Sequence, residues 1–147
     1  MISKNPIKLL KKEIKLFKEV IVNFENESPI QLKNYQKLCE VSLKALKKEK
    51  KIIFFGNGGS AADSQHLATE LTVKYKKKRN AFAGISLSTD VSAITATGND
   101  FGFKYIFSRQ IEALGNSGDV VVALTTSGNS ENLIEACKIA NKKNILT

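Results

Sequence analysis

The chain has 147 residues, of which 42% are hydrophobic and 25% are charged, with a formal net charge of +9. This length suits one domain with a buried core, and the composition is ordinary for a globular protein. No apolar run approaches the ~20 residues of a membrane span. Charged residues interrupt the apolar ones at the N-terminus, which excludes a signal peptide there. We therefore expect a cytoplasmic protein with no membrane partner.

The positive charge comes mainly from three lysine-rich runs, Lys47–Lys51, Lys74–Arg79 and Asn141–Lys143. They lie at the ends of expected elements with little aromatic interleaving, so we interpret them as solvated helix ends and expect no nucleic-acid partner. The excess charge would attract anionic substrates. The two cysteines, Cys39 and Cys137, lie far apart in expected helices, which favours reduced, half-buried thiols over a disulfide or a metal pair.

The first fifty residues predict two helices. Charged residues separate an apolar series at spacings of three and four, formed by Ile7, Leu10, Ile14, Phe17, Ile21 and Phe24. Such a narrow stripe is typical of an amphipathic helix, and its regularity suggests a helix bundle between subunits. Ser28 and Pro29 break this helix, and a second one follows, ending near Lys47–Lys51.

From Lys51 onward, expected strands alternate with expected helices. Apolar strands are predicted at 51–55, 81–87 and 119–126, and a fourth begins at 144 as the chain stops. Helices are predicted at 60–76, 105–114 and 131–142. This alternation predicts an α/β fold with a parallel sheet covered on both faces. We predict one domain over 1–147, with N-terminal helices in 1–50 and the α/β core in 51–147.

A glycine-rich turn, Gly56–Ser60, follows the first strand of the core. Its glycines allow close approach of a ligand, and the N-terminus of the next helix favours an anion. The run GNGGSA also matches the dinucleotide-binding fingerprint. However, Asp90, the acidic residue after the next strand, lies further from the turn than the usual ~20 residues. The turn by itself leaves both a dinucleotide and a sugar phosphate open.

A second turn, Thr125–Ser130, follows the third strand with the sequence TTSGNS. Its four hydroxyls, its glycine and the helix start behind it suit a phosphate without any Arg or Lys. An ordinary N-cap would require one such polar residue, whereas this turn has five. Together the two turns favour a small phosphorylated metabolite over an extended dinucleotide.

The helix after the first turn carries Asp63, His66 and Glu70 on one face. A His and a Glu at i and i+4 can share a metal ion or form a proton-transfer site. The alternative is a solvated face with a Glu70–Lys74 pair, and spacing alone does not decide between them. His66 is the only histidine in the chain, so a metal site would need ligands of another type or from another subunit.

Three motifs in this order, GNGGSAADSQHLATEL, STDVSAITATGNDFGFKYIFSRQIEALG and TTSGNS, resemble the sugar isomerase (SIS) domain family. The resemblance is closer to its phosphoheptose isomerase branch and runs from about Leu32 to the last residue. It implies a three-layer α/β/α sandwich, assembled as a homotetramer with the N-terminal helices at its centre. It also implies interconversion of sedoheptulose 7-phosphate and D-glycero-D-manno-heptose 7-phosphate, for the heptose of lipopolysaccharide core, capsule or surface-layer sugars.

The resemblance further implies the site residues. His66 and Glu70 match two ligands of the family's zinc ion, and Glu70 also matches its proposed catalytic base. Lys74 stands where arginine is common, which keeps the charge but loses the bidentate fork. Thr125 stands where serine is common and keeps the hydroxyl. The substrate contacts, besides Glu70, match Asn57, Gly58, Gly59, Ser60, Asn99, Asp100, Thr125, Thr126, Ser127 and Ser130.

In the family a Gln and a second His on a C-terminal helix complete the site, and the sequence has no such helix. We therefore expect a domain that stops after its fourth strand, as a truncated gene product, a fragment of a longer chain or a degenerate binding domain, with little or no isomerase activity by itself. The alternative function is a non-catalytic SIS domain that senses a sugar phosphate or acts as a protein-binding adaptor. Retention of His66, Glu70 and Asp100 favours the enzyme lineage, and the two turns with GND make a dinucleotide enzyme the weakest alternative.

Overall fold

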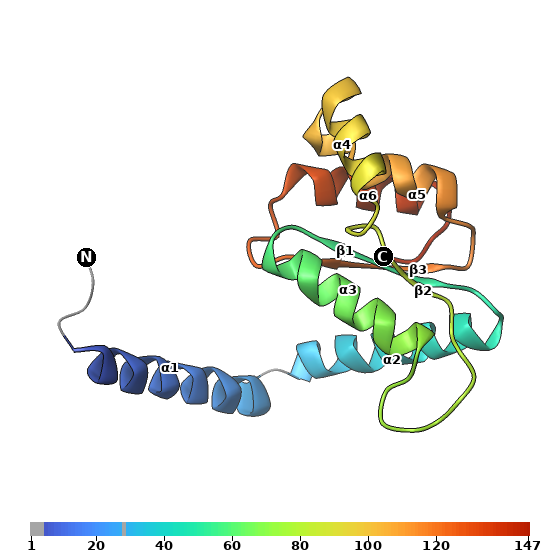
Figure 1. Cartoon of the computed structure of the whole chain (residues 1–147). Coiled ribbons are helices and arrows are strands. Elements are labelled where there is room, and N and C mark those ends of the chain that lie inside the picture. The colour runs from blue at the N-terminus through green and yellow to red at the C-terminus, as the bar shows by residue number, and fades with distance from the viewer. Residues whose placement is uncertain (1–4, 28) are drawn as a thin grey trace. The chain divides into compact units, whose positions relative to one another are not determined.

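The structure is a computed structural model that describes residues 5–27 and 29–147 (Figure 1). Clustering of the backbone divides the chain into two units, one up to Glu40 and one from Val41 to Thr147. The helix α2, Pro29–Lys47, belongs to both units. The prediction of one domain over 1–147 stays a prediction.

The first unit contains α1, Pro6–Glu27, and the first part of α2. Pro6 is the first residue of α1, and the Asn5 side chain accepts a hydrogen bond from the Lys8 N–H at 2.9 Å, as expected for an N-cap before a proline. The predicted apolar stripe is exposed along its whole length, from 46% at Ile14 to 67% at Ile7. Each of the six stripe residues is therefore exposed in the described part of the chain.

The second unit is built on a three-stranded parallel sheet in the order β2-β1-β3. This agrees with the predicted α/β fold. The sequence between the strands forms helices, and the last of them has the same bounds as predicted. In chain order the elements are β1 Ile52–Gly56, α3 Gly59–Thr72, β2 Gly84–Ser86, α4 Val91–Asp100, the 3₁₀-helix η1 Phe103–Tyr105, α5 Ser108–Leu114, β3 Val120–Leu124 and α6 Glu131–Lys142.

Helices cover both faces of the sheet. Successive side chains of a strand point to opposite faces, so β1 contributes residues to a core on each side. Ile53 and Phe55 of β1 join a core with residues of α5 and α6, such as Ile111. Ile52 and Phe54 join a second core with Ala45 of α2 and Ala68 of α3. Figure 1 shows α5 and α6 on one side of the sheet and α3 on the other. The layers are those of the predicted α/β/α sandwich.

Three helices differ from the prediction. The polar stretch around 91–100, for which no element is predicted, forms α4, because the Asp90 carboxylate caps it by accepting the Ala93 N–H at 2.9 Å. The predicted helix 60–76 ends earlier, at Thr72. The predicted helix 105–114 begins at Ser108, after the separate turn η1. Local propensity is weak in all three places, so packing and caps decide the bounds.

The predicted fourth strand is present only as a single parallel bridge between Leu146 and Val120. Asn144 has a left-handed backbone with φ of 55°, and the Ile145 N–H still bonds back to the Ala140 carbonyl of α6. The chain is therefore extended over its last residues alone, and the sheet has three strands instead of four.

Two smaller predictions concern membranes and cysteines. Within residues 5–27 and 29–147, no helix has the length and apolar character needed to cross a membrane. Cys39 and Cys137 are free thiols, as predicted. Cys137 is half-buried, which raises the pKa of its thiol. Cys39 is exposed and not half-buried, since it lies on a helix that buries little of its surface.

Candidate functional site

The two predicted phosphate turns follow β1 and β3, which are paired neighbours. Gly56 and Leu124 are opposite one another in register, so both turns leave the same edge of the sheet. In parallel sheets ligands bind at this edge, where helices begin. Gly58 has φ of 56° and is the N-cap of α3, a backbone conformation that side chains other than glycine's disfavour. The fold thus brings the first turn and the second turn together, as the sequence predicts for a shared ligand.

The second turn holds its hydroxyls in place with its own backbone. Thr125 Oγ1 accepts a hydrogen bond from the Gly128 N–H at 3.1 Å, and Ser127 Oγ accepts one from the Asn129 N–H at 3.2 Å. Ser130 is the N-cap of α6, but its side chain makes no capping bond. Each of these hydroxyls keeps its hydrogen for an external acceptor. The turn is therefore more than a capped helix start, and its donors suit an anion.

An amide pair joins the first turn to the helix α6. Asn57, in the first turn, and Asn132, in the first turn of α6, exchange two hydrogen bonds, Asn57 Nδ2 to Asn132 Oδ1 at 3.0 Å and Asn132 Nδ2 to Asn57 Oδ1 at 2.8 Å. Asn132 is only 3% exposed. Sequence reasoning missed Asn132, although an asparagine two residues after the SGNS turn places a carboxamide on the helix that the turn starts.

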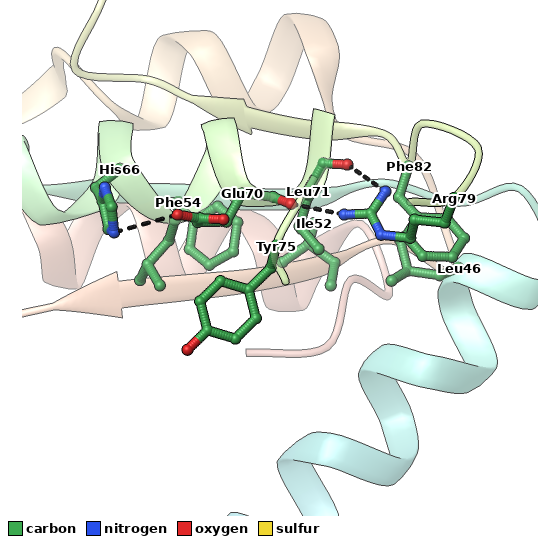
Figure 2. Close-up of a pocket in the computed structure, with 10 residues that line it drawn as sticks. Leu46, Ile52, Phe54, His66, Glu70, Leu71, Tyr75, Arg79 and Phe82 are labelled. Atoms are coloured by element: carbon green, nitrogen blue, oxygen red, sulfur yellow. Dashed lines mark hydrogen bonds and ion pairs between the residues drawn. The ribbon is translucent and has the colours of Figure 1, made fainter. Parts of the chain in front are cut away.

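His66 and Glu70 form the predicted pair on α3. His66 Nε2 lies 3.6 Å from Glu70 Oε1 (Figure 2). Both line a groove of about 560 Å³ beside the sheet, whose other walls are largely apolar and include Ile52, Phe54 and Tyr75. His66 is seven residues beyond Gly59, or about 10 Å along the helix. The first phosphate turn and the His66–Glu70 pair thus belong to the same helix, the turn at its start and the pair along its side.

The geometry of this pair fits a shared metal ion in part. Two ligand atoms at about 2.0–2.1 Å from a tetrahedral zinc ion lie about 3.3 Å apart, close to the observed separation. His66 is the more exposed partner, so its imidazole is accessible. Among the residues that the structure describes, however, no group of three or more His, Cys, Asp and Glu gathers around one point. The described chain supplies two ligands and would need others.

Arg79 is a groove residue that sequence reasoning interpreted only as part of a lysine-rich run. Its guanidinium donates to the carbonyl of Leu71 at 2.9 Å and to that of Glu70 at 2.6 Å, and lies 4.5 Å from the Phe82 ring centre. Figure 2 shows this fork at the end of α3. The sequence signal for this contact was a single arginine among lysines, because only the planar guanidinium can donate to two carbonyls in this way.

The other predicted contacts lie outside these clusters or are exposed. Asn99 and Asp100 are exposed at the end of α4, where Asn99 Nδ2 donates to Asp100 Oδ1 at 2.7 Å. Lys74 is exposed beyond the end of α3. The side chain that lies next to the Glu70 carboxylate is that of His66, in place of the alternative partner Lys74. The contacts of Asn99, Asp100 and Lys74 with a substrate stay predictions.

Comparison with known proteins agrees with this fold. The family model described as the SIS domain matches residues 16–147. The chain is 56% identical over 107 residues to a phosphoheptose isomerase of Campylobacter concisus, covering 73% of this chain and 57% of that protein. It is 53% identical over 120 residues to one of Campylobacter jejuni, covering 82% of this chain and 64% of that protein. The chain therefore spans about three fifths of the length of these curated relatives.

The chain is also similar to solved structures of phosphoheptose isomerases. A phosphoheptose isomerase from Neisseria gonorrhoeae superposes with a TM-score of 0.80 at 42% identity, covering 93% of this chain and 71% of that one. One from Francisella tularensis superposes with a TM-score of 0.89 at 28% identity, covering 96% and 72%. The chain belongs to the SIS domain family, within its phosphoheptose isomerase branch.

Proposed function

We propose that the chain carries the sugar-phosphate site of an aldose–ketose isomerase that interconverts sedoheptulose 7-phosphate and D-glycero-D-manno-heptose 7-phosphate. The observation that carries the proposal is the pair of turns at the ends of β1 and β3, which presents hydroxyls and helix N-termini at one edge of the sheet. Such an edge binds a phosphate through N–H and O–H donors. Relatives named phosphoheptose isomerase support the substrate class.

In this proposal Glu70 is the general base. Its carboxylate takes a proton from C1 of the ketose and returns a proton to C2, while a proton passes from O1 to O2, so that the two sugars are isomers. His66 lies next to Glu70 and can stabilise the negative charge of the carboxylate or of an enediolate oxygen. Thr125, Ser127 and Ser130 hold the phosphate end of the sugar.

We also propose that His66 and Glu70 supply two ligands of a zinc ion, whose further ligands come from outside the described residues. When bound, zinc would stabilise the negative charge of the enediolate. A homotetramer, a cytoplasmic location and a role in surface heptose synthesis are parts of the same proposal. Stoichiometric zinc in protein purified without a His tag would support the metal site, and protein free of zinc after growth in zinc-supplemented medium would contradict it.

Ligand binding tests the phosphate site directly. Calorimetric titration of the 147-residue chain with sedoheptulose 7-phosphate should show binding that inorganic phosphate competes with and that sedoheptulose alone does not reproduce. Ser127→Ala should weaken binding about tenfold, because a hydrogen bond to a charged group is lost. Ser117→Ala, an exposed serine before β3, is the matched control. Absence of wild-type binding would overturn the proposed function.

Isotope exchange tests whether the site is catalytic. In D₂O, an enediol route incorporates deuterium at C1 of the ketose, which mass spectrometry detects even when turnover is slow. We expect weak incorporation by this chain and none by Glu70→Gln, with Glu112→Gln, an exposed carboxylate on α5, as control. Binding without incorporation by the wild type would favour the sensor or adaptor function instead.

A further inference from the structure

The amide pair between Asn57 and Asn132 connects residues 75 apart in the sequence. Asn57 follows β1 directly, and Asn132 lies two residues beyond the N-cap of α6. The pair therefore bridges the segment after β1 and the helix after β3, which are the two segments that present the proposed phosphate donors. Neither Asn57 nor Asn132 belongs to the apolar cores in which the sheet and the helices pack together.

The pair also restricts what Asn57 can do for a ligand. Each carboxamide donates one hydrogen bond and accepts one, so Asn57 retains a single N–H hydrogen for other partners. Its orientation is set before any ligand arrives, because the buried Asn132 cannot turn without leaving its own polar atoms unpaired. A site fixed in this way avoids the entropy of ordering the turn on binding.

We propose that Asn132 is a positioning residue that holds the Asn57 carboxamide in place. Through Asn57 it also fixes the position of the turn Gly56–Ser60 relative to the turn Thr125–Ser130. One sugar phosphate then meets both turns at once. The inference rests on the proposed function for its ligand, but the coupling of the two turns is a property of the free protein. It can therefore be measured with and without ligand.

The test compares Asn132→Asp with the matched variant Asn141→Asp, an exposed asparagine on the same helix. Aspartate has nearly the same shape but cannot donate to Asn57 Oδ1, so one of the two hydrogen bonds is lost. The reporters in the ligand-free protein are the Ser60 and Ala61 N–H groups, which bond to the Asn57 and Gly58 carbonyls at 3.0 Å. Amide exchange is followed by NMR, and β1 and β3 serve as the reference for global opening.

In Asn132→Asp we expect the Ser60 and Ala61 amides to exchange about tenfold faster while the strand amides do not change. We also expect the Kd for sedoheptulose 7-phosphate to rise about tenfold, with Asn141→Asp like the wild type in both measurements. Should Asn132→Asp fail to fold, Asn57→Asp removes a hydrogen bond of the same pair and is read at the Leu133 amide, which bonds to the Ser130 carbonyl.

The outcomes separate the two proposals. Faster exchange confined to the turns, in a protein whose wild type binds no sugar phosphate, supports the positioning role and overturns the proposed function. Exchange in Asn132→Asp equal to that in Asn141→Asp overturns the positioning role, whatever the ligand result. Equal acceleration in the turns and the strands overturns it as well, since the pair would then act only on global stability.

Discussion

Gly56 lies where the end of β1, the first turn of α3 and the end of β3 meet. A Cβ at this position would lie 2.6 Å from the Ser60 Cβ, 2.8 Å from the Leu124 carbonyl oxygen and 2.8 Å from the Ser60 carbonyl oxygen. Two of these three atoms belong to the backbone, so the contact cannot be relieved by a side-chain rotation. The close approach that brings the two turns together therefore depends on a residue without a side chain.

Replacing Gly56 by alanine should lower the free energy of unfolding by about 2–3 kcal/mol, the cost of overpacking a tight site. Urea denaturation followed by circular dichroism measures this. Gly59→Ala is the matched control, because a Cβ there meets nothing within 4 Å, and a helical Gly→Ala change stabilises by about 0.4–1 kcal/mol. Equal stability of the two variants would contradict the packing argument.

Asp119 ties the beginnings of β1 and β3 at the opposite edge of the sheet. Its carboxylate is 1% exposed, lies 2.7 Å from Lys51 Nζ, and accepts the backbone N–H of Lys51 at 3.0 Å and of Asn116 at 2.8 Å. Burial by itself raises the pKa of Asp119, but the hydrogen bonds and the Lys51 charge outweigh it and hold the pKa below the usual value.

A lowered folded-state pKa predicts acid sensitivity with a definite sign. The stabilisation from Asp119 is fully present above the unfolded pKa of about 3.9 and is lost as the pH falls through the lower folded-state value. Asp119→Asn should cost about 2 kcal/mol at pH 7 and remove part of the acid dependence. Urea denaturation at several pH values measures both. Asp63→Asn, on the exposed side of α3, should change neither, and an unaltered acid dependence in Asp119→Asn would contradict this role.

At the scale of the elements, α3 connects the first phosphate turn with the proposed catalytic pair. It begins at the first turn, presents the His66–Glu70 pair along one side, and ends at Thr72. The C-terminal carbonyls of a helix have no partners within it, and here Arg79 satisfies two of them, those of Glu70 and Leu71. The arginine thereby fixes the turn of the helix that bears the proposed base.

Arg79→Lys should loosen this end of α3, because an ammonium cannot bridge two carbonyls as the guanidinium does. We expect a loss of about 1 kcal/mol in the free energy of unfolding. The N–H of Val73, which bonds to the Thr69 carbonyl, should also exchange faster. The neighbouring exposed Lys78→Arg serves as control. If the Val73 amide stays protected from exchange in Arg79→Lys, the end of α3 does not depend on the two hydrogen bonds of the guanidinium.

At the scale of the whole molecule, α1 has no buried residue among those described, although six apolar residues line one side of it. A large exposed apolar surface of this kind marks a contact with another protein surface. A second copy of the same chain is the partner we propose, in line with the homotetramer expected from the sequence.

Phe17→Asp should weaken self-association, since it places a charge in the middle of the apolar stripe, where Phe17 is 66% exposed in the single chain. Lys18→Asp reverses a charge next to it, off the stripe, and should have little effect. Sedimentation velocity over a range of concentrations measures the assembly state. A wild type that is monomeric at high concentration, or equal assembly of both variants, would contradict the proposed contact.

The sequence by itself determined the α/β class, the strands β1 and β3, the bounds of α6 and the two turns. Apolar runs that continue through a strand, and glycines placed at its end, are local signals. It also predicted that His66 and Glu70 lie on one face of a helix, because spacing along a helix fixes which residues share a face.

Only the tertiary structure decided which polar contacts join residues of different elements. The pairing of Asn57 with Asn132, the fork of Arg79 and the carboxylate of Asp119 join residues 8 to 75 positions apart, so no local pattern reports them. The end of α3, where Arg79 bonds to the carbonyls of Glu70 and Leu71, has the same reason. The helix α4 instead begins at a local cap, Asp90, which the prediction did not use. Periodicity predicts which face of an element is buried, but only packing determines which polar groups meet at the site.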